Sequence, residues 1–439
     1  MTTSAPVRLP AADRPEPPAR PSRRRHLLVF GINYAPEPTG TALNTTWQTE
    51  ALGELGWDVE IVTGGPHYPM WRRVPAPRRE RRGDVRVTRR RHYIPAEQTA
   101  IHRGVYEITW VVSALPTIRG RRDVDVVLGI VPSLGGAALA TLAAARYGVP
   151  CALVFQDVIA RAAEMSGMAG ASRVASRVQT VETALARRAD GIGIVAEGYR
   201  DYFVRGGVDP SRIFRIRNPA RLGAPREPRE QVRARLGWPD DVFVALHTGS
   251  MGHKQGLENV LRAADLARDD PGLLFVLQGD GNQKTKLEED ARRLRLPNVR
   301  FLPIAPADEF PGIVCAADAL LLNQRGSVSN MSMPAKLASY FLAGVPVIAA
   351  VSLGDETSKE VDASGGGVVI PPERPERLLD EIAKLRRDPE RALQLGRTGL
   401  SYAQRFLTTD SAIAGVREFL EACLVRAANG GKTREGDKR

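Results

Sequence analysis

The sequence predicts an α/β protein made of two doubly wound domains that face a central cleft. Three observations predict this class. Short apolar runs alternate with helical patterns, which is typical of parallel sheets covered by helices. The alternation stops at a segment rich in Pro and charge and then restarts. The length of 439 residues suits two domains better than one.

The first domain is expected over residues 27–221. The stretches "HLLVFGINYAP" and "WDVEIVTGGPHYP" each begin as a buried strand and end in a Gly/Pro turn, and "ALNTTWQTEALGELG" between them has helical spacing with a glycine stop. The pattern repeats in "DVDVVLGIVPS", "LGGAALATLAAARYG" and "VPCALVFQD", and "RIFRIRNPA" closes this half. Residues 222–231 are rich in Pro and charge and are expected to be a linker.

The second domain is expected over residues 232–405. The predicted strands are "VFVALHTGS", "LLFVLQGDG", "ALLLNQ", "VPVIAA" and "GGVVIPP", and helical patterns such as "GLENVLRAADLARDD" and "MPAKLASYFLAG" lie between them. A final amphipathic helix over 406–427 is expected to pack back across the junction between the two halves.

The composition of both ends of the chain predicts disorder. Residues 1–26 are rich in Pro, Arg and Ala and lack the apolar segment of a signal peptide, and residues 428–439 are polar. No run of eighteen apolar residues occurs, so no membrane span is expected. The three cysteines have neither metal nor disulfide spacing, which favours a buried role in a reducing cytoplasm.

The net charge of +12 is concentrated in an arginine-rich stretch from Trp71 to His92. Such density favours contact with the phosphates of an anionic membrane or of lipids over an ordinary solvated surface. Nucleic acid is disfavoured because no DNA- or RNA-binding signature accompanies the arginines. The residues expected at this face are Trp71, Arg72, Arg73, Arg89, Arg90 and Arg91.

Glycine turns recur where the strands of both halves should end. Gly40 precedes the first helix of the first half, Gly249 and Gly252 precede the first helix of the second, and Gly279 follows the next strand. Helix N-termini at such places expose unpaired N–H groups that bind anions. Neither G-x-G-x-x-G with a spaced acid nor a Walker loop is present, which disfavours a dehydrogenase and a P-loop ATPase.

Two lysines stand at helix starts, where the helix dipole disfavours cations. Lys254 follows the "TGSMGH" turn, and Lys336 falls in the first turn after the polar loop that contains Ser332. A bound diphosphate would compensate both charges. The alternative for Lys254 is an ordinary solvent-facing side chain.

The set of motifs "GINYAPEPTGTALNTTW", "TGSMGHKQGLENVLRAA", "LQGDG", "MPAKLASYFLAGVPVIA" and "GGGVVIPP" resembles the family 4 retaining glycosyltransferases of the GT-B fold, in particular the colanic-acid and exopolysaccharide type. The resemblance runs from about His26 to about Leu424. It implies two Rossmann-like domains, an N-terminal one for the acceptor and a C-terminal one for the nucleotide sugar. It also implies transfer of a sugar from a nucleotide-diphosphate sugar to a glycan or lipid-linked acceptor, with retention, in cell-surface polysaccharide biosynthesis.

The resemblance assigns roles to individual residues. Lys254 matches the lysine that grips the donor diphosphate, Lys336 lies near the sugar and phosphate loop, and Asp157 matches an aspartate that faces the cleft and orients the acceptor. These three are the expected catalytic residues. The expected donor-binding residues are Gly40, Gly249, Ser250, Gly252, Lys254, Gly279, Ile304, Ser332 and Lys336.

The sequence departs from the family at several positions. Met331 and Ser339 stand where many members have two glutamates, and Gln156 stands where a histidine often precedes the aspartate. The arginine that usually precedes the donor lysine is missing. The departures keep two alternatives open: a nucleotide-sugar epimerase of the same fold, and a degenerate, non-catalytic nucleotide-sugar-binding protein.

No metal and no other cofactor is expected. Suitable acidic pairs are lacking, because Asp123 and Asp125 in "DVDVV" precede a buried strand and are expected to begin it. The expected location is the cytoplasm, including the inner face of the cytoplasmic membrane as a peripheral protein. The sequence does not identify the sugar, the base, the acceptor or the oligomeric state.

Overall fold

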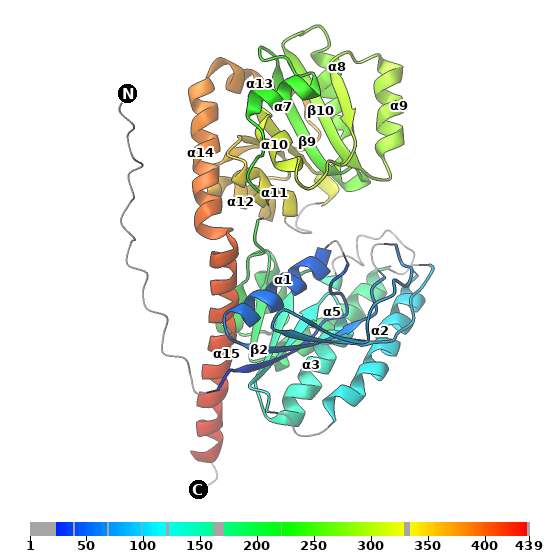
Figure 1. The fold of residues 1–439 in the computed structure, drawn as a ribbon, viewed down its shortest axis with the longest axis vertical. Coiled ribbons are helices and arrows are strands. Elements are labelled where there is room, and N and C mark those ends of the chain that lie inside the picture. The colour runs from blue at the N-terminus through cyan, green and yellow to red at the C-terminus, as the bar shows by residue number, and fades with distance from the viewer. Residues whose placement is uncertain are drawn as a thin grey trace, which may run out of the picture.

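The computed structural model describes residues 23–37, 40–67, 70–97, 99–119, 123–160, 171–220, 222–328 and 334–436. It holds two α/β domains stacked end to end, with the helices α14 and α15 running along one side of both (Figure 1). Each domain contains one mainly parallel sheet with helices on both faces. The predicted fold class is therefore confirmed.

Eight strands form the sheet of the first domain, in the order β3-β4-β2-β1-β5-β6-β7-β8. Neighbouring strands are parallel except β3, which pairs antiparallel with β4. The apolar runs are buried along their whole length, as strands covered on both faces must be. The strands are β1 (His26–Phe30), β2 (Asp58–Gly64), β3 (Arg79–Arg82), β4 (Val85–Arg90), β5 (Val126–Val131), β6 (Cys151–Phe155), β7 (Gly191–Ile194) and β8 (Ile213–Arg215).

Helices cover both faces of this sheet. One core contains residues of α2, α3 and α5, and the core on the opposite face contains residues of α1 and of the last helix of the chain. Ser133 caps the N-terminus of α3, and Gly148 ends the helix in the left-handed conformation at φ 69°. The helices are α1 (Gly40–Glu54), α2 (Ala100–Ala114), α3 (Leu134–Tyr147), α5 (Ala171–Arg188) and α6 (Tyr199–Arg205), with short 3-10 turns η1 (Leu115–Ile118) and η2 (Pro210–Arg212).

Six parallel strands form the sheet of the second domain, in the order β11-β10-β9-β12-β13-β14. The strands are β9 (Phe243–Ser250), β10 (Leu273–Asp280), β11 (Val299–Leu302), β12 (Ala319–Asn323), β13 (Val347–Ala350) and β14 (Gly367–Ile370). The helices are α7 (Arg229–Leu236), α8 (Glu258–Leu266), α9 (Lys284–Leu294), α10 (Phe310–Cys315), α11 (Ala335–Leu342), α12 (Glu356–Ser364), α13 (Pro375–Arg387) and α14 (Pro389–Phe406), with the turns η3 (His253–Gln255) and η4 (Gly326–Val328).

The chain returns to the first domain at its end. Helix α14 packs against α11, α12 and α13 of the second domain, and α15 (Thr409–Gly436) packs against α1, β6 and β7 of the first. The buried apolar residues of α15 follow helical spacing: Ala412, Ile413, Val416, Phe419, Leu420 and Cys423. A disordered tail was expected from residue 428, but α15 continues to Gly436. Adding residues to a helix that has already formed costs little free energy, because each added residue gains a hydrogen bond.

The domains also touch along their connection. Arg215 of β8 donates to Glu360 of α12 at 2.7 Å, and the amide of Ala220 donates to the carbonyl of Leu407 at 2.7 Å. The linker predicted over residues 222–231 is shorter in the structure, because α7 already begins at Arg229. Of the expected N-terminal arm, residues 1–22 lie outside the described residues, and β1 begins at His26.

The arginine-rich stretch is more ordered than a charge run suggests. It contains the β3–β4 pair, and β4 extends the parallel sheet beside β2. The β4 sequence "VRVTRR" alternates, with Val85 and Val87 buried. That period of two is the signal for a strand. In the described part of the chain, no helix is both long and apolar enough to cross a bilayer.

Candidate functional site

The candidate site lies where β9 and β10 of the second domain end. The two strands are in register, so Gly279 lies beside Gly249 and Asp280 beside Ser250. Gly249 and Gly279 have φ of 99° and 142°, and a Cβ on Gly279 would lie 1.9 Å from the carbonyl oxygen of Gly249. Only glycine fits there. Gly252 is the residue before the η3 turn. The predicted glycines Gly249, Gly252 and Gly279 therefore lie close together at the ends of β9 and β10.

Lys336 reaches this place from the first turn of α11. Its Nζ would lie 3.5 Å from a Cβ on Gly249, and it lies 3.3 Å from Nε2 of His247 on β9. The residue is half-buried along its length, but its ammonium group is enclosed, and this burial alone lowers the pKa of Lys336 to about 7. Among the described residues no carboxylate pairs with it, so an anion entering here would meet an uncompensated cation.

His247 is the partner that sequence reasoning missed. It is fully buried, and burial, followed by the nearby charge of Lys336, holds its pKa well below the ordinary value. Its Nε2 also lies 3.3 Å from the carbonyl of Ser250. A neutral imidazole therefore lines the enclosure of Lys336. The available signal was a polar residue in the otherwise apolar strand "VFVALH".

Lys254 lies in the exposed η3 turn, on the connection that begins at Gly249. Its backbone carbonyl accepts a hydrogen bond from the amide of Arg325 at 2.9 Å, which ties the turn to the end of β12. The positive charge of Lys254 is close enough to lower the pKa of Asp157 in the other domain, although burial dominates and raises the pKa of that carboxyl. The two predicted residues thus approach one another from opposite domains.

Asp157 follows β6 and is held by its neighbours. Its Oδ1 accepts from the amide of Val158 at 2.8 Å and from the hydroxyl of Tyr199 at 3.4 Å. The next turn is fixed by Glu182 of α5, a buried residue that the sequence did not single out. Its carboxylate accepts from the amides of Ile159 and Ala160 and from a tyrosine hydroxyl, and burial raises its pKa.

Gly40 begins α1 at φ 60°, and a Cβ there would meet no atom within 4 Å. The same helix contributes Asn44, whose amide donates to Gln156 at 3.2 Å. Gln156 and Asn218 exchange hydrogen bonds of 2.9 and 3.3 Å. An amide network therefore connects α1 with the residues after β6 and β8.

A second cluster missed by the sequence lies between the loops after β1 and β2. The carboxylate of Glu37 accepts from the amide of His67 at 2.9 Å and from Nδ2 of Asn33 at 2.9 Å. The hydroxyl of Tyr106 lies 3.2 Å from Nε2 of His67, whose pKa is lowered by burial. Because all the polar atoms named here are bonded inside the protein, the cluster holds the two loops together.

The remaining donor-binding predictions have separate outcomes. Ile304 lies two residues beyond β11 and its side chain is largely exposed. Ser332 lies outside the described residues, as does Met331. Ser250 is exposed at the end of β9.

The predicted membrane residues divide into two groups. Arg72, Arg73 and Arg91 are exposed. Arg89 is buried and donates to Glu80 and to the carbonyls of Pro77 and Ala35, so the prediction that it contacts headgroups is wrong.

Trp71 and Arg90 are also turned toward the protein. Trp71 packs edge-on against His67 and Tyr106, with the guanidinium of Arg103 4.8 Å from its ring centre. Arg90 donates through Nε to the carbonyl of Ser113. Both side chains therefore connect the arginine-rich stretch to α2 or to the β2 loop.

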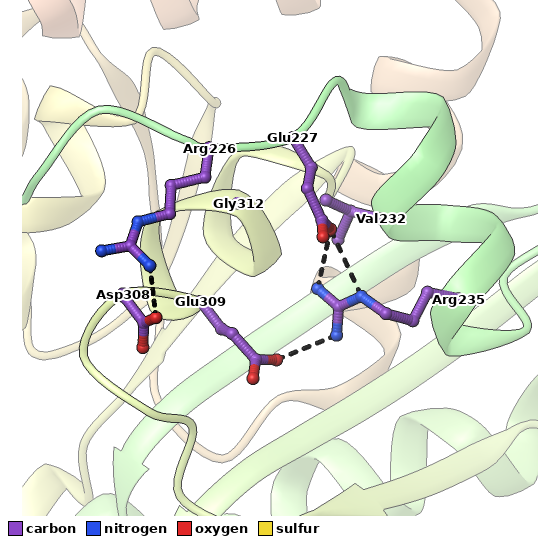
Figure 2. Close-up of a pocket in the computed structure, with 7 residues that line it drawn as sticks. All are labelled: Arg226, Glu227, Val232, Arg235, Asp308, Glu309 and Gly312. Carbon is purple, nitrogen blue, oxygen red and sulfur yellow. Dashed lines mark hydrogen bonds and ion pairs between the residues drawn. The ribbon is translucent and has the colours of Figure 1, made fainter.

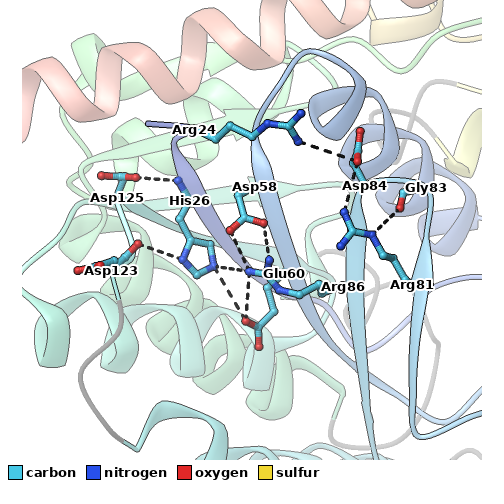
Figure 3. Close-up of polar contacts among 10 residues, drawn as sticks. All are labelled: Arg24, His26, Asp58, Glu60, Arg81, Gly83, Asp84, Arg86, Asp123 and Asp125. Atoms are coloured by element: carbon cyan, nitrogen blue, oxygen red, sulfur yellow. Dashed lines mark hydrogen bonds and ion pairs between the residues drawn. The ribbon is translucent and has the colours of Figure 1, made fainter. Parts of the chain in front are cut away.

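Asp123 and Asp125 lie at the amino edge of the first sheet. Figure 3 shows the carboxylate of Asp125 accepting from the amide of His26 at 2.7 Å, where β1 begins. Arg86 pairs with Asp58 in the same region. These charges therefore organise strand beginnings. Within the described ranges, no group of three or more His, Cys, Asp or Glu has the arrangement of a metal site.

A hollow of about 290 Å³ lies between the start of α7 and the segment before α10 (Figure 2). Its charged residues are already paired with one another: Arg226 with Asp308, and Arg235 with Glu227 and Glu309. The hollow contains none of the predicted site residues.

Two family models match the chain, one per domain. A model described as a glycosyl transferase 4-like domain matches residues 39–219, and a model described as glycosyl transferases group 1 matches residues 228–401. A putative colanic acid biosynthesis glycosyl transferase WcaI of Escherichia coli (strain K12) is 29% identical over 370 residues, which cover 81% of this chain and 91% of that protein. D-inositol 3-phosphate glycosyltransferase 1 of Catenulispora acidiphila is 31% identical over 214 residues, 46% of this chain and 49% of that protein.

Solved structures share the fold at low identity. Sucrose-phosphate synthase from Thermosynechococcus elongatus has a TM-score of 0.70 and 16% identity, covering 91% of this chain and 98% of its own. Anabaena Alr3699/HepE in complex with UDP and glucose has a TM-score of 0.65 and 15% identity, covering 91% and 100%. WaaG, a glycosyltransferase involved in lipopolysaccharide biosynthesis, has a TM-score of 0.59 and 16% identity, covering 88% and 98%.

Proposed function

Because the chain belongs to the family 4-type glycosyltransferases of the GT-B fold, we propose that it transfers a sugar from a nucleotide-diphosphate sugar to a lipid-linked glycan acceptor, with retention of anomeric configuration. The product would serve cell-surface polysaccharide biosynthesis; the name of WcaI gives colanic acid biosynthesis for that protein, and the description of WaaG gives lipopolysaccharide biosynthesis. The reaction would take place at the cytoplasmic face of the membrane.

The observation that carries the donor assignment is the enclosed ammonium of Lys336. It lies beside Gly249 at the end of β9, with a neutral imidazole and no paired carboxylate among the described residues. A diphosphate would supply the missing counter-charge, and a strand end next to a helix start is where α/β domains bind phosphates. The bound UDP of the Anabaena structure is consistent with a nucleotide donor for this fold.

In the proposed reaction, the bond between the anomeric carbon and the donor phosphate breaks while the acceptor oxygen attacks on the same face. The acceptor proton passes to the leaving phosphate. Lys336 and Lys254 would stabilise the negative charge that grows on that phosphate, which is the main task of such a site and requires no metal. Asp157, held by Val158 and Tyr199, would orient the acceptor hydroxyl.

The proposal is tested by nucleotide binding and by transfer. Calorimetry with UDP, GDP and ADP should find one that binds wild-type protein, and Lys336→Met should weaken its binding at least tenfold. Lys254→Ala should lower transfer to a lipid-linked acceptor. Arg262→Gln, an exposed change on α8, serves as the matched loss of a positive charge and should leave both measurements unchanged. Unaltered affinity and turnover in the two lysine variants would refute the assignment.

A further inference from the structure

Strand β9 loses its neighbour on one side before it ends. Its pairing with β12 covers Ala245 and Leu246, whereas its pairing with β10 continues to Ser250. Thr248 lies in the part of β9 that runs beside β10 alone, and it is buried. A buried backbone amide requires an acceptor, so the amide of Thr248 must find one outside the sheet if it points away from β10.

The amide of Thr248 does point to the side that β12 has left. The Val244 amide donates to the carboxylate of Asp318 at 2.7 Å, and the Val244 carbonyl accepts from the Asp318 amide at 2.9 Å. Asp318 directly precedes β12, so Val244 faces that strand. Alternate residues of a parallel strand form their backbone hydrogen bonds on the same side, and Thr248 therefore faces the same way as Val244.

Tyr340 of α11 supplies the acceptor. Its hydroxyl accepts from the amide of Thr248 at 2.9 Å and lies 3.1 Å from the hydroxyl of the same threonine. Tyr340 is fully buried, and this burial raises the pKa of its hydroxyl to about 12, so the group keeps its proton at neutral pH. A protonated hydroxyl can accept from the amide and donate to the threonine oxygen. Helix α11 is thus bonded to the backbone of β9.

Tyr340 stands one helical turn after Lys336. Residues four positions apart lie on the same face of a helix. Their contacts fall on consecutive residues of β9, because Lys336 lies beside His247 and Gly249 and Tyr340 lies beside Thr248. One face of α11 therefore meets the end of β9 both through the hydroxyl and through the ammonium group.

Apolar packing alone fixes this face of α11 less sharply. Leu337 and Phe341 are buried in the core of the second domain, but apolar burial is not directional. A hydrogen bond to a backbone amide sets both a distance and an angle. Pro334, which precedes α11, makes no side-chain capping hydrogen bond. The bond from Thr248 to Tyr340 is thus a directional contact close to Lys336.

We propose that Tyr340 is a positioning residue for Lys336: its hydroxyl holds α11 against the end of β9 and thereby keeps the Lys336 ammonium enclosed beside Gly249 and His247. The purpose of this placement rests on the function proposed above, in which the ammonium meets the donor diphosphate. Without the hydroxyl, helix and strand can separate, water reaches the ammonium, and the cation lies farther from the phosphate. Tyr340 acts through Lys336 and not on the donor itself.

The first test needs no nucleotide. Tyr340→Phe removes the hydroxyl and keeps the ring. The full-length protein is labelled with acetic anhydride at a series of pH values, and mass spectrometry follows the peptide that contains Lys336. The labelling midpoint in wild type should lie near the pKa of about 7. In Tyr340→Phe the midpoint should rise by about one pH unit or more, because water around the ammonium favours its charged form.

The second test is a double-mutant cycle on nucleotide affinity. By calorimetry, Tyr340→Phe should weaken binding roughly three- to tenfold for the one of UDP, GDP and ADP that binds wild type. Added to Lys336→Met, the same change should have no further effect, because the side chain that it positions is gone. A general structural loss would instead weaken binding by the same factor with and without Lys336.

The matched control removes another hydrogen-bonded tyrosine hydroxyl from the second domain. The hydroxyl of Tyr402 on α14 donates to Glu360 at 2.8 Å. Tyr402→Phe should leave both the labelling midpoint of Lys336 and the nucleotide affinity unchanged. Cooperative thermal unfolding of each variant shows that it is folded.

Two results would overturn the proposal. One is the same Lys336 labelling midpoint in wild type and Tyr340→Phe. The other is an equal loss of nucleotide affinity from Tyr340→Phe with and without Lys336. If none of the three nucleotides binds, the donor assignment fails, while the labelling midpoint still decides whether Tyr340 positions Lys336.

Discussion

Lys336 and Lys254 both stand at helix starts in the sequence, but the structure gives them different environments. Lys254 is exposed on the η3 turn and faces Asp157 of the other domain. The ammonium of Lys336 is enclosed beside His247. Solvent screens the first charge and not the second, so the enclosed lysine should contribute more to phosphate binding per charge.

Donor binding should therefore depend on pH through Lys336. With a pKa of about 7, the lysine is charged below that value and neutral above it. A bound diphosphate favours the charged form, so the dissociation constant of the nucleotide should rise by up to tenfold per pH unit between pH 7 and 9. Calorimetry across this range measures the slope. Lys336→Arg keeps a permanent charge and should bind with little pH dependence; the same slope in both proteins would contradict the assignment.

The unliganded protein should show the linked effect on stability. The folded pKa of Lys336 lies below the unfolded value of 10.5, so the unfolded chain holds more protons between pH 7 and 10.5. The free energy of unfolding should gain a positive contribution from this lysine as pH rises through that window. Urea denaturation at several pH values should find this contribution reduced in Lys336→Met.

Residue-level prediction from sequence succeeded where local pattern decides and failed where tertiary packing decides. A lysine in the first turn of a helix is visible in "MPAKLASY", and the glycine turns are visible in "TGSMG" and "QGDG". The neutral His247 and the supporting Glu182 are not, because their importance comes from neighbours 89 and 23 positions away.

At the scale of elements, the arginine-rich stretch contains the strand β4, although its many charged residues suggest an exposed loop. Alternation in "VRVTRR" puts valines into the core and turns the intervening side chains out of it. The next position of the buried register falls on Arg89, and its guanidinium is satisfied there by Glu80 and two carbonyls. The buried parallel strands were predictable because a short continuous apolar run is the typical sequence of a strand covered on both faces. The β3–β4 pair was harder to predict because its alternating pattern lies inside a run of charged residues.

Arg89→Gln should consequently destabilise the protein. The change removes a buried ion pair with Glu80 and leaves the carbonyls of Ala35 and Pro77 with weaker donors. A loss of roughly 3–5 kcal/mol in the free energy of unfolding is expected, as when one partner of a buried pair is removed. Denaturant unfolding measures it.

The control for Arg89 is Arg91, two positions along the same segment. Arg91 is exposed, and Arg91→Gln should change the free energy of unfolding by less than about 0.5 kcal/mol. If the two variants were equally stable, the structural role given to Arg89 would be wrong, and the predicted contact of Arg89 with lipid headgroups would have to be reconsidered.

On the scale of the whole molecule, the two domains are not independent lengths of chain. The core of the first domain is completed by α15, which comes from the end of the sequence, and β8 contacts α12 through Arg215 and Glu360. The restart of the α/β pattern after residue 222 predicted two domains because each sheet requires its own series of strands and helices. Pattern alone does not show which sheet covers an amphipathic terminal helix, since its apolar face would suit either.

Shortening a buried side chain of α15 should therefore destabilise the first domain, although α15 comes from the end of the sequence. Phe419 is fully buried and packs against Phe214 at a ring distance of 5.3 Å. Phe419→Ala should cost roughly 3–5 kcal/mol and lower the melting temperature of the first domain. Val425→Ala, an exposed change on the same helix, should have little effect. Hydrogen exchange separates the domains: faster exchange in β5, β6 and β7 with unchanged protection in β9 and β10 is expected, and loss of protection confined to the second domain would show that α15 stabilises the other half.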